Sequence, residues 1–159
     1  MTQHSDFIPY ILPLPKDRAA QRRFYHWVFG SDTALDVLRA ASLERRIYQR
    51  DLIKDLDYSN KTIIETLKRL VALDVLHESM EKVRVKGKAV WVKSYTPTNI
   101  GRWIALLFLP LPRVKSEIVE DTLEQLFELY VKNAVQLCHR YGIDVKILRE
   151  VFEAAFTPK

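Results

Sequence analysis

The stretch from Tyr48 to Tyr95 reads YQRDLIKDLDYSNKTIIETLKRLVALDVLHESMEKVRVKGKAVWVKSY, and its patterning decides the fold. Apolar residues recur at helical spacing in two sets, which predicts two helices that each bury one stripe. The first set is Leu52, Ile53 and Leu56, and the second is Ile63, Ile64, Leu67, Leu70 and Val71. Between the sets, Ser59 can cap the second helix by accepting a backbone N–H, with Thr62 as a further candidate. Two helices therefore meet across a short turn.

The pattern changes to alternation after Leu76, which predicts a β-hairpin with Gly87 at its turn. Valines share one face and basic residues the other in the first strand: Val83 and Val85 against Lys82, Arg84 and Lys86. The second strand alternates in the same way: Val90 and Val92 against Trp91, Lys93 and Tyr95. From Lys82 to Lys93 there are five Lys or Arg and no acid. Such a strip suits a phosphate backbone or a minor groove.

Two helices followed by a basic hairpin are the pattern of a winged helix-turn-helix. With Ile63, Leu67 and Leu70 turned inward, the other faces of the second helix carry Asn60, Lys61, Thr62, Glu65, Thr66, Lys68 and Arg69. Short polar residues at its start suit base edges and phosphates in a major groove. The alternatives are an ordinary solvated helix face and lysines that discourage edge-strand aggregation. We favour DNA contact because the hairpin follows a helix pair.

The segment SNKTIIETLKRLVALDVLHES, the basic hairpin and YTPTNIGRW together resemble winged-helix regulators of the ArsR, MarR and PadR type, over about Ser31 to Trp103. Ser59, Thr62, Leu67 and Leu70 match the typical spacing, whereas the Thr-Pro motif after the hairpin is one residue longer. The resemblance implies a prokaryotic, archaeal source and DNA contacts at Ser59, Asn60, Lys61, Thr62, Glu65, Lys68, Arg69, Arg84, Lys86 and Lys88. Glu65 departs from the family pattern, because an acid repels phosphate unless it accepts from a cytosine amino group.

Length and composition fit a compact regulator. The chain has 159 residues, of which 48% are hydrophobic, so it can bury one core or a small domain with helical extensions. Charge is uneven: residues 1–30 and the hairpin are net basic, whereas residues 114–159 hold eight acids against six bases. This asymmetry fits a module that meets nucleic acid on one face and protein on the other.

Localisation is predicted to be cytoplasmic. A single cysteine, Cys138, excludes an intramolecular disulfide framework, and no secretory signal opens the chain. The apolar run from Trp103 to Leu111 is about half the length that a bilayer requires, so we expect a buried helix or a subunit contact and no membrane partner.

The regions flanking the helix pair and hairpin are predicted to be helical, apart from an extended arm. An amphipathic helix is expected over residues 16–29, after a proline-rich arm over Phe7 to Pro15 that packs on a second subunit or on its own domain. A long helix is expected from Ser116 to Tyr141, ended by Gly142, with Asp144 capping a last helix.

The long helix carries an apolar seam close to a heptad repeat, which predicts a homodimer contact. We assign dimerisation to Val119, Leu123, Leu126, Phe127, Tyr130, Ala134, Leu137 and Tyr141. A second row of Phe127, Val131, Val135 and Cys138 widens this apolar face. An intrachain helical bundle is the alternative, because periodicity does not say whose core is filled.

No motif indicates catalysis, a metal or a cofactor. The histidines His4, His26, His77 and His139 are dispersed, and no Cys/His pair has zinc spacing. A buried thiol is the favoured interpretation of Cys138; redox sensing would require it to be exposed with a lowered pKa. The sequence contains neither a glycine-rich phosphate loop nor a nucleophile motif, so an enzyme is the class least expected.

The sequence thus predicts a mainly α protein with a small hairpin wing and flanking helices that form a dimerisation layer. Its parts are an arm and helix (1–30), a winged helix-turn-helix (31–97) and a helical dimerisation region (98–159). The expected function is sequence-specific binding of double-stranded DNA as a homodimeric transcriptional repressor, with an effector unknown. The alternative is a winged protein-interaction module without DNA binding, whose contact surface would lie around Trp103 to Leu111.

Overall fold

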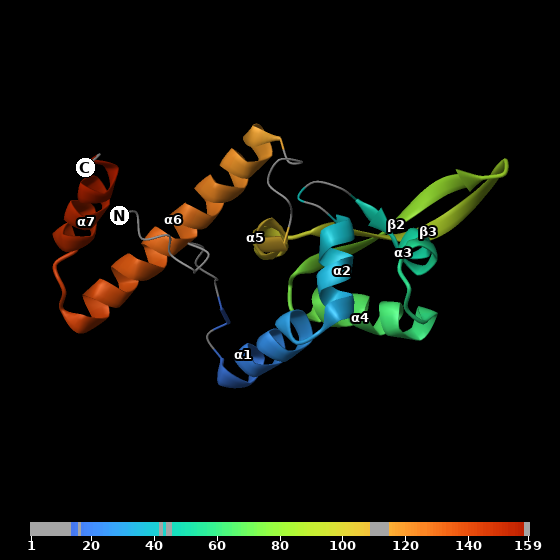
Figure 1. Cartoon of the computed structure of the whole chain (residues 1–159), viewed down its shortest axis with the longest axis horizontal. Coiled ribbons are helices and arrows are strands. Elements are labelled where there is room, and N and C mark those ends of the chain that lie inside the picture. Colours follow the sequence, from blue (N-terminus) through green and yellow to red (C-terminus); the bar gives the residue numbers. More distant parts are fainter. Residues whose placement is uncertain (1–13, 16, 42, 44–45, 109–114, 158–159) are drawn as a thin grey trace, which may run out of the picture. The chain divides into compact units, whose positions relative to one another are not determined.

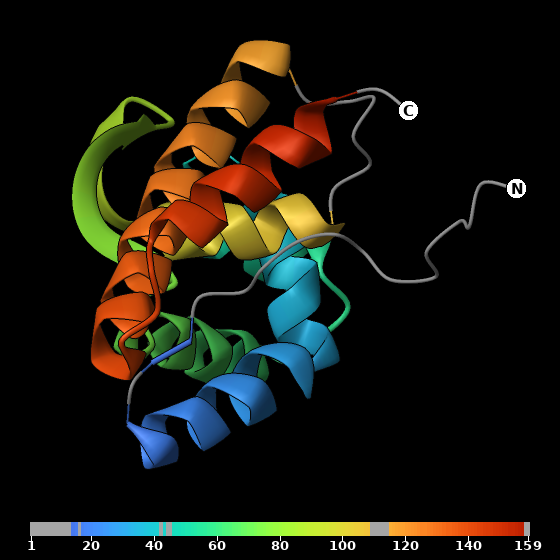
Figure 2. The same ribbon diagram turned by 90° about the vertical axis from the view of Figure 1, so that its left-hand side faces the viewer.

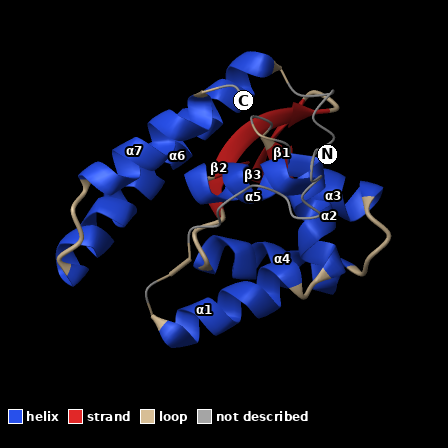
Figure 3. Ribbon diagram, turned by 60° about the vertical axis from the view of Figure 1, so that its left-hand side comes forward, coloured by secondary structure: helices blue, strands red, loops and turns tan. Residues whose placement is uncertain are grey.

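The computed structural model describes residues 14–15, 17–41, 43, 46–108 and 115–157 (Figure 1). They form a mainly helical protein with a small antiparallel sheet, which confirms the expected mainly α composition with a β-hairpin; Figure 3 shows the sheet in red and the helices in blue. The elements are α1 (Arg18–Phe24), the π-helix η1 (Tyr25–Phe29), α2 (Asp32–Ala41), β1 (Ile47–Tyr48), α3 (Gln49–Asp55), α4 (Asn60–Ala72), β2 (Leu76–Val85), β3 (Lys88–Pro97), α5 (Asn99–Phe108), α6 (Ser116–Tyr141) and α7 (Lys146–Phe156).

The chain divides into two compact units, residues 1–123 and residues 124–159. This division does not coincide with the boundaries expected after residues 30 and 97. The reason lies in the core of the first unit, which takes Phe24 and Val28 from before residue 31 and Ile104 from after residue 97. An apolar stripe shows that a helix is buried, but it does not identify the core that the helix joins.

The predicted helix pair is present as α3 and α4. Ser59 caps α4 as expected: its Oγ accepts the backbone N–H of Thr62 at 3.1 Å and lies 2.8 Å from Thr62 Oγ1. Ile63, Leu67 and Leu70 are fully buried, as predicted. Thr66 was predicted to face outward, and this is wrong: it is buried. Its position three residues after Ile63 and four before Leu70 places it on the same helix face as both.

The end of α4 turns directly into the sheet. Asp74 has a positive φ of 58°, the backbone N–H of Val75 donates to the Leu70 carbonyl and that of Asp74 donates to the Val71 carbonyl. These two bonds form a Schellman motif, in which glycine is the usual residue at the positive-φ position. The Thr98 hydroxyl donates to the carbonyl of Asp74 or of Val75, at 2.5 and 3.1 Å, so the helix end is fastened to the chain just before α5.

The core of the first unit lies among α1, η1, α2, α3, α4, the sheet and α5. Its buried residues are Phe24, Val28, Ala34, Val37, Leu38, Ala41, Ile47, Leu52, Ile63, Leu67, Leu70, Val75, Leu76, Tyr95 and Ile104. The helix expected over residues 16–29 is present as α1 and η1, with Asp17 accepting the N–H of Ala20 at 2.7 Å. Most of the proline-rich arm lies outside the described residues, but Leu14 packs against this core.

Helix α5 confirms that the apolar run beginning at Trp103 forms a buried helix. Trp103, Ile104, Ala105 and Leu106 are each no more than 2% exposed. Gly101 lets this helix approach the sheet, because a Cβ there would lie 1.9 Å from the Val75 carbonyl oxygen. The surface expected for a protein-interaction module is therefore not available at residues 103–106, and residues 109–111 lie outside the described residues.

In the second unit, α7 lies along α6 (Figure 2). Helix α6 has the predicted span, and Gly142 ends it with a φ of 65° while the N–H of Ile143 donates to the Cys138 carbonyl at 2.9 Å. Asp144 was expected to cap the last helix, but the N-cap of α7 is Val145, which makes no side-chain cap bond; the Asp144 carboxylate, one residue earlier, accepts the N–H of Lys146 at 3.0 Å. The rings of Phe127 and Phe152 pack with centroids 5.3 Å apart.

The strained C-terminus of α4 gives a stability prediction. Asp74→Gly should raise the free energy of unfolding by about 0.5 kcal/mol, because relief of the left-handed conformation outweighs the extra backbone entropy of glycine. Ala72→Gly, two residues earlier and within the helix, should lower it by about 1 kcal/mol. Urea denaturation of both variants measures the pair; a loss of stability in both would contradict the assignment of position 74.

Candidate nucleic-acid interface

The predicted hairpin is a long wing formed by β2 and β3, which projects beyond α3 and α4 in Figure 1. Its register runs from Leu76 opposite Pro97 to Val85 opposite Lys88, and β3 also pairs with β1, so the strand order is β1-β3-β2. A two-residue turn joins the strands, with φ values of 49° at Lys86 and 80° at Gly87. Positive φ at both positions is typical of the tight turn that matches the twist of a hairpin. The predicted tip is thus confirmed.

Acidic residues occur only at the base of the wing, and each is neutralised there. Glu81 of β2 pairs with Arg46 and accepts a hydrogen bond of 3.0 Å from the Tyr48 hydroxyl. Glu78 accepts from Lys93 Nζ at 3.0 Å and from the Tyr95 hydroxyl at 2.9 Å. These bonds fasten the wing to β1 and leave its base without net acidic character.

The electrostatics of the base follow from these contacts. The Lys93 ammonium, which donates to Glu78, holds the pKa of that carboxyl below its usual range. Burial, and then the hydrogen bond to Glu78, raises the pKa of Tyr95. Its hydroxyl also lies 3.2 Å from Gln49 Oε1, so one buried phenol lies within hydrogen-bond distance of α3 and of β2.

The distal wing, residues 82–91, has the opposite character. Its four cations Lys82, Arg84, Lys86 and Lys88 are exposed. None of them forms an ion pair with a carboxylate among the residues that the structure describes. Positive charge that no acid neutralises is therefore concentrated away from the body of the unit, where a polyanion could approach it.

The register divides the distal wing into two faces. Lys82 opposes Trp91 and Arg84 opposes Ala89 on one face, while Val83 opposes Val90 on the other. Lys88 opposes Val85 and so lies with the valines, close to the tip. Trp91 is 62% exposed. On the sequence pattern alone, Trp91 is only a residue that alternates with the valines. Its place on the strand face that carries the cations is the signal that marks it as a candidate site residue.

The N-terminal half of α4 presents the remaining predicted contacts. Ser59, Asn60, Lys61, Thr62 and Glu65 are all exposed. The hydroxyls of Ser59 and Thr62 are within hydrogen-bond distance of each other, whereas Lys61 Nζ lies 4.0 Å from Glu65 Oε1. The Lys61 ammonium therefore partly neutralises the negative charge of Glu65, the acid that would otherwise repel phosphate.

The C-terminal half of α4 differs in its surroundings. The Arg69 guanidinium lies over the Trp27 ring, 5.6 Å from its centroid, in the last turn of the helix. Lys68 is close enough to Glu78 to help lower the pKa of that carboxyl. Both side chains are exposed. With a rise of 1.5 Å per residue, Arg69 lies about 13 Å along the helix axis from Asn60, so it is distant from the contacts predicted at the N-terminus of α4.

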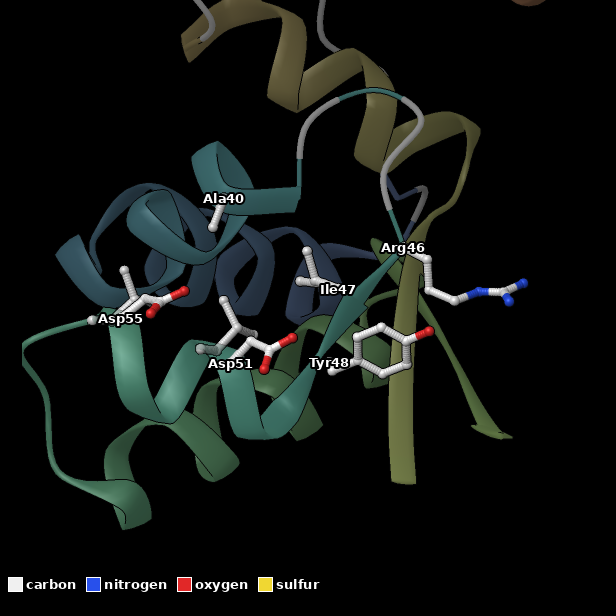
Figure 4. A pocket seen from close by; sticks show the side chains of 8 residues that line it. Ala40, Arg46, Ile47, Tyr48, Asp51 and Asp55 are labelled. Carbon is white, nitrogen blue, oxygen red and sulfur yellow. The ribbon is translucent and has the colours of Figure 1, made fainter. Parts of the chain in front are cut away.

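A pocket of about 270 Å³ lies where α2, β1 and α3 meet, lined by Ala40, Arg46, Ile47, Tyr48, Asp51, Leu52, Asp55 and Leu56 (Figure 4). Two of its three charged side chains have partners, since Arg46 pairs with Glu81 and Asp51 lies 3.5 Å from Arg50 Nε. Figure 4 shows the Arg46 guanidinium extending away from the two aspartates.

Other kinds of site find little support in the described part of the chain. No three of its His, Cys, Asp and Glu side chains are grouped so that they could hold a metal ion. Cys138 is buried, as expected. Among the described helices, none combines the length and the apolar character needed to cross a membrane.

Comparison with known proteins gives one similar structure. No protein-family model and no curated protein matches the sequence. Among solved structures, the chain is similar to the adhesin competence repressor (AdcR) from Streptococcus pyogenes, with 21% identity over 79% of this chain and 78% of that chain and a TM-score of 0.40. A TM-score this low does not define a shared fold, so the function is argued below from the residues of this chain.

The ion pair at the wing base predicts a pH dependence. Because the folded-state pKa of Glu78 is lowered, its contribution to stability is full above its unfolded pKa of about 4.3 and is lost as the pH falls through the folded pKa. Glu78→Gln should therefore flatten the loss of stability on the acid side. In a Lys93→Met background the same change should have less effect, with a coupling of about 0.5 kcal/mol. Urea unfolding from pH 3 to 7 measures both; equal effects in the two backgrounds would contradict the pairing.

Proposed function

We propose that this protein is a sequence-specific DNA-binding transcriptional regulator that acts as a homodimer. The observation that carries the proposal is the sorting of charge along the wing. The carboxylates at its base are paired, and the four cations of the distal wing have no acidic partner among the described residues. DNA phosphates can pair with these four cations. When the cations neutralise phosphates, condensed counterions are released from the DNA, and this release favours binding.

The start of α4 supplies the second part of the proposed interface. Asn60 and Lys61 are exposed at the N-terminus of the helix that follows the turn, the position from which recognition helices contact base edges. Asparagine can pair with adenine and lysine with guanine in a major groove. Glu65, balanced by Lys61, can accept from a cytosine amino group. We propose that these residues read sequence while the wing binds the backbone.

The proposed homodimer rests on the apolar seam of α6. On the side of α6 that faces α7, Phe127 of the second row packs on Phe152, and Val131 and Val135 line a pocket between the two helices. The seam itself is open in the single chain: Leu123, Tyr130, Leu137 and Tyr141 are 41%, 42%, 55% and 70% exposed. An apolar strip of this length is unusual on a monomer and is typical of an interface. A second copy of the same helix, with the same seam, is the proposed partner.

A two-fold dimer sets the geometry of the target. Two recognition helices related by a dyad would enter successive major grooves, so the proposed operator is an inverted repeat with half-site centres about 10 bp apart or a multiple of that spacing. Repression by occlusion follows from the family resemblance of residues 31–103, and no residue identifies an effector.

The first experiment is fluorescence anisotropy with DNA from the protein's own upstream region and with scrambled DNA, at several salt concentrations. Tight, salt-dependent binding that favours the upstream fragment is expected. Equal binding to both fragments would contradict sequence-specific regulation and would indicate a non-specific architectural DNA-binding protein. If the protein does not bind DNA at low salt, the alternative hypothesis, a winged protein-interaction module without DNA binding, is favoured.

The distal wing gives the matched variant test. Lys86→Ala with Lys88→Ala should weaken binding to all sequences and reduce the slope of log affinity against log salt by about 2, because two phosphate contacts are lost. Lys132→Ala with Lys146→Ala removes the same charge from α6 and α7 and should leave the slope unchanged. If both pairs act alike, the effect is one of net charge, and the wing is not in the interface.

The seam gives a test of the dimer. Leu137→Glu should yield a folded monomer, because this exposed side chain does not support the core of its own chain. His139→Glu, on the polar side of α6 near Glu128 and Lys132, should leave the dimer intact. Light scattering gives the mass and circular dichroism the fold; a stable Leu137→Glu dimer would remove the seam from the interface.

A further inference from the structure

One apolar group on the wing is not explained by folding. Trp91 is 62% exposed, although the chain's other tryptophans are sheltered: Trp103 is 2% exposed, and Trp27 lies beneath Arg69. Met80 on the adjacent strand is 51% exposed. Large apolar side chains exposed together commonly mark a binding surface. An indole that is mostly in water contributes less to the stability of the wing than a buried one would.

The register places two cations of the neighbouring strand beside this indole. Lys82 is directly opposite Trp91, and the pairs on either side bring Arg84 and Met80 to the diagonal positions of the same face. Lys93, two residues along the strand, also shares the face but is held by Glu78. The cations free to act beside the indole are therefore Lys82 and Arg84.

The chemistry of this face selects the partner. Cations beside an apolar ring complement a surface on which apolar groups lie between anions. The minor groove of duplex DNA has this form, with sugars forming its walls and phosphates at its rims. The groove is about 6 Å wide. An indole standing out from the sheet can enter it while Lys82 and Arg84, both on the neighbouring strand, reach phosphates at its rim.

We propose that Trp91 is a minor-groove contact of the wing, packed against the sugar walls while Lys82 and Arg84 on the neighbouring strand bind phosphates at the rim of the groove. This inference rests on the proposed DNA-binding function and adds a contact that does not depend on charge. Proteins that bind the minor groove commonly place apolar side chains there. The valine face of the wing, with Val90 43% exposed, would then face away from the DNA.

The test separates apolar contact from charge by the salt dependence. Trp91→Ala should weaken binding about fivefold or more at every salt concentration without changing the slope of log affinity against log salt. Lys82→Ala with Arg84→Ala should instead reduce that slope. Trp91→Phe, which keeps a ring, should recover most of the affinity. Val90→Ala, an exposed apolar residue of the same strand on the opposite face, is the matched control and should bind like the parent protein.

A second measurement identifies the groove. Netropsin, which occupies the minor groove, should weaken the parent protein to the level of Trp91→Ala and should weaken that variant less. Iodide quenching of the exposed indole should fall when DNA is added, and this loss should be absent in Trp91→Phe. Because Trp91 lies outside the core, unchanged urea midpoints are expected for all variants.

The outcomes distinguish the two proposals. If the parent protein binds DNA and Lys86→Ala with Lys88→Ala weakens it, while Trp91→Ala binds as tightly as the parent, the contact by Trp91 is overturned and the DNA-binding function stands. If Trp91→Ala changes the salt slope as the lysine variants do, the apolar contact is likewise overturned. If the parent protein does not bind DNA at low salt, both proposals fail.

Discussion

The buried phenol of Tyr95 is the interaction on which the geometry of the wing depends. It lies on the central strand, within hydrogen-bond distance of Glu78 on the neighbouring strand and of Gln49 at the start of α3. Tyr95 also belongs to the hydrophobic core. The same residue therefore joins the core, the first helix of the helix pair and the root of the hairpin. A wing that projects into solvent can keep a defined direction only if its root is fixed in this way.

Charge also changes from the root of the wing to its tip. Near the root, Glu78 and Glu81 neutralise Lys93 and Arg46. Toward the tip, carboxylates are lacking and the cations stand in water, where screening makes their mutual repulsion small. The acidic side chains thus stabilise the root of the wing through their ion pairs, and the cations toward the tip are available to a negatively charged partner. The exposed indole adds apolar area to this charged face, so affinity need not come from phosphate contacts alone.

Features that depend on nearby residues could be predicted from the sequence. The Ser59 cap, the glycine turn and the full span of α6 are encoded within a few residues of one another. Features that depend on packing could not. The sequence left open whether the run from Trp103 is buried in its own chain or at a subunit contact, and that choice depends on elements distant in sequence. The burial of Thr66, by contrast, follows from its helical spacing to Ile63 and Leu70 and could have been predicted. The pairing of Glu78 with Lys93 follows from strand register, which alternation alone does not fix.

The two-residue turn at Lys86 and Gly87 has a consequence for how such wings can change over time. An added residue in the turn would have to be taken up as a longer loop; if the two-residue turn were kept instead, the pairing of every position beyond it would shift by one, because side chains alternate across a strand. Trp91 would then exchange faces with Val90 relative to the fixed strand β2, or β3 would lose its bonds to β1. Loop length is therefore constrained as tightly as residue identity. Families that carry an aromatic on the wing should accept substitutions at the tip more readily than insertions or deletions there.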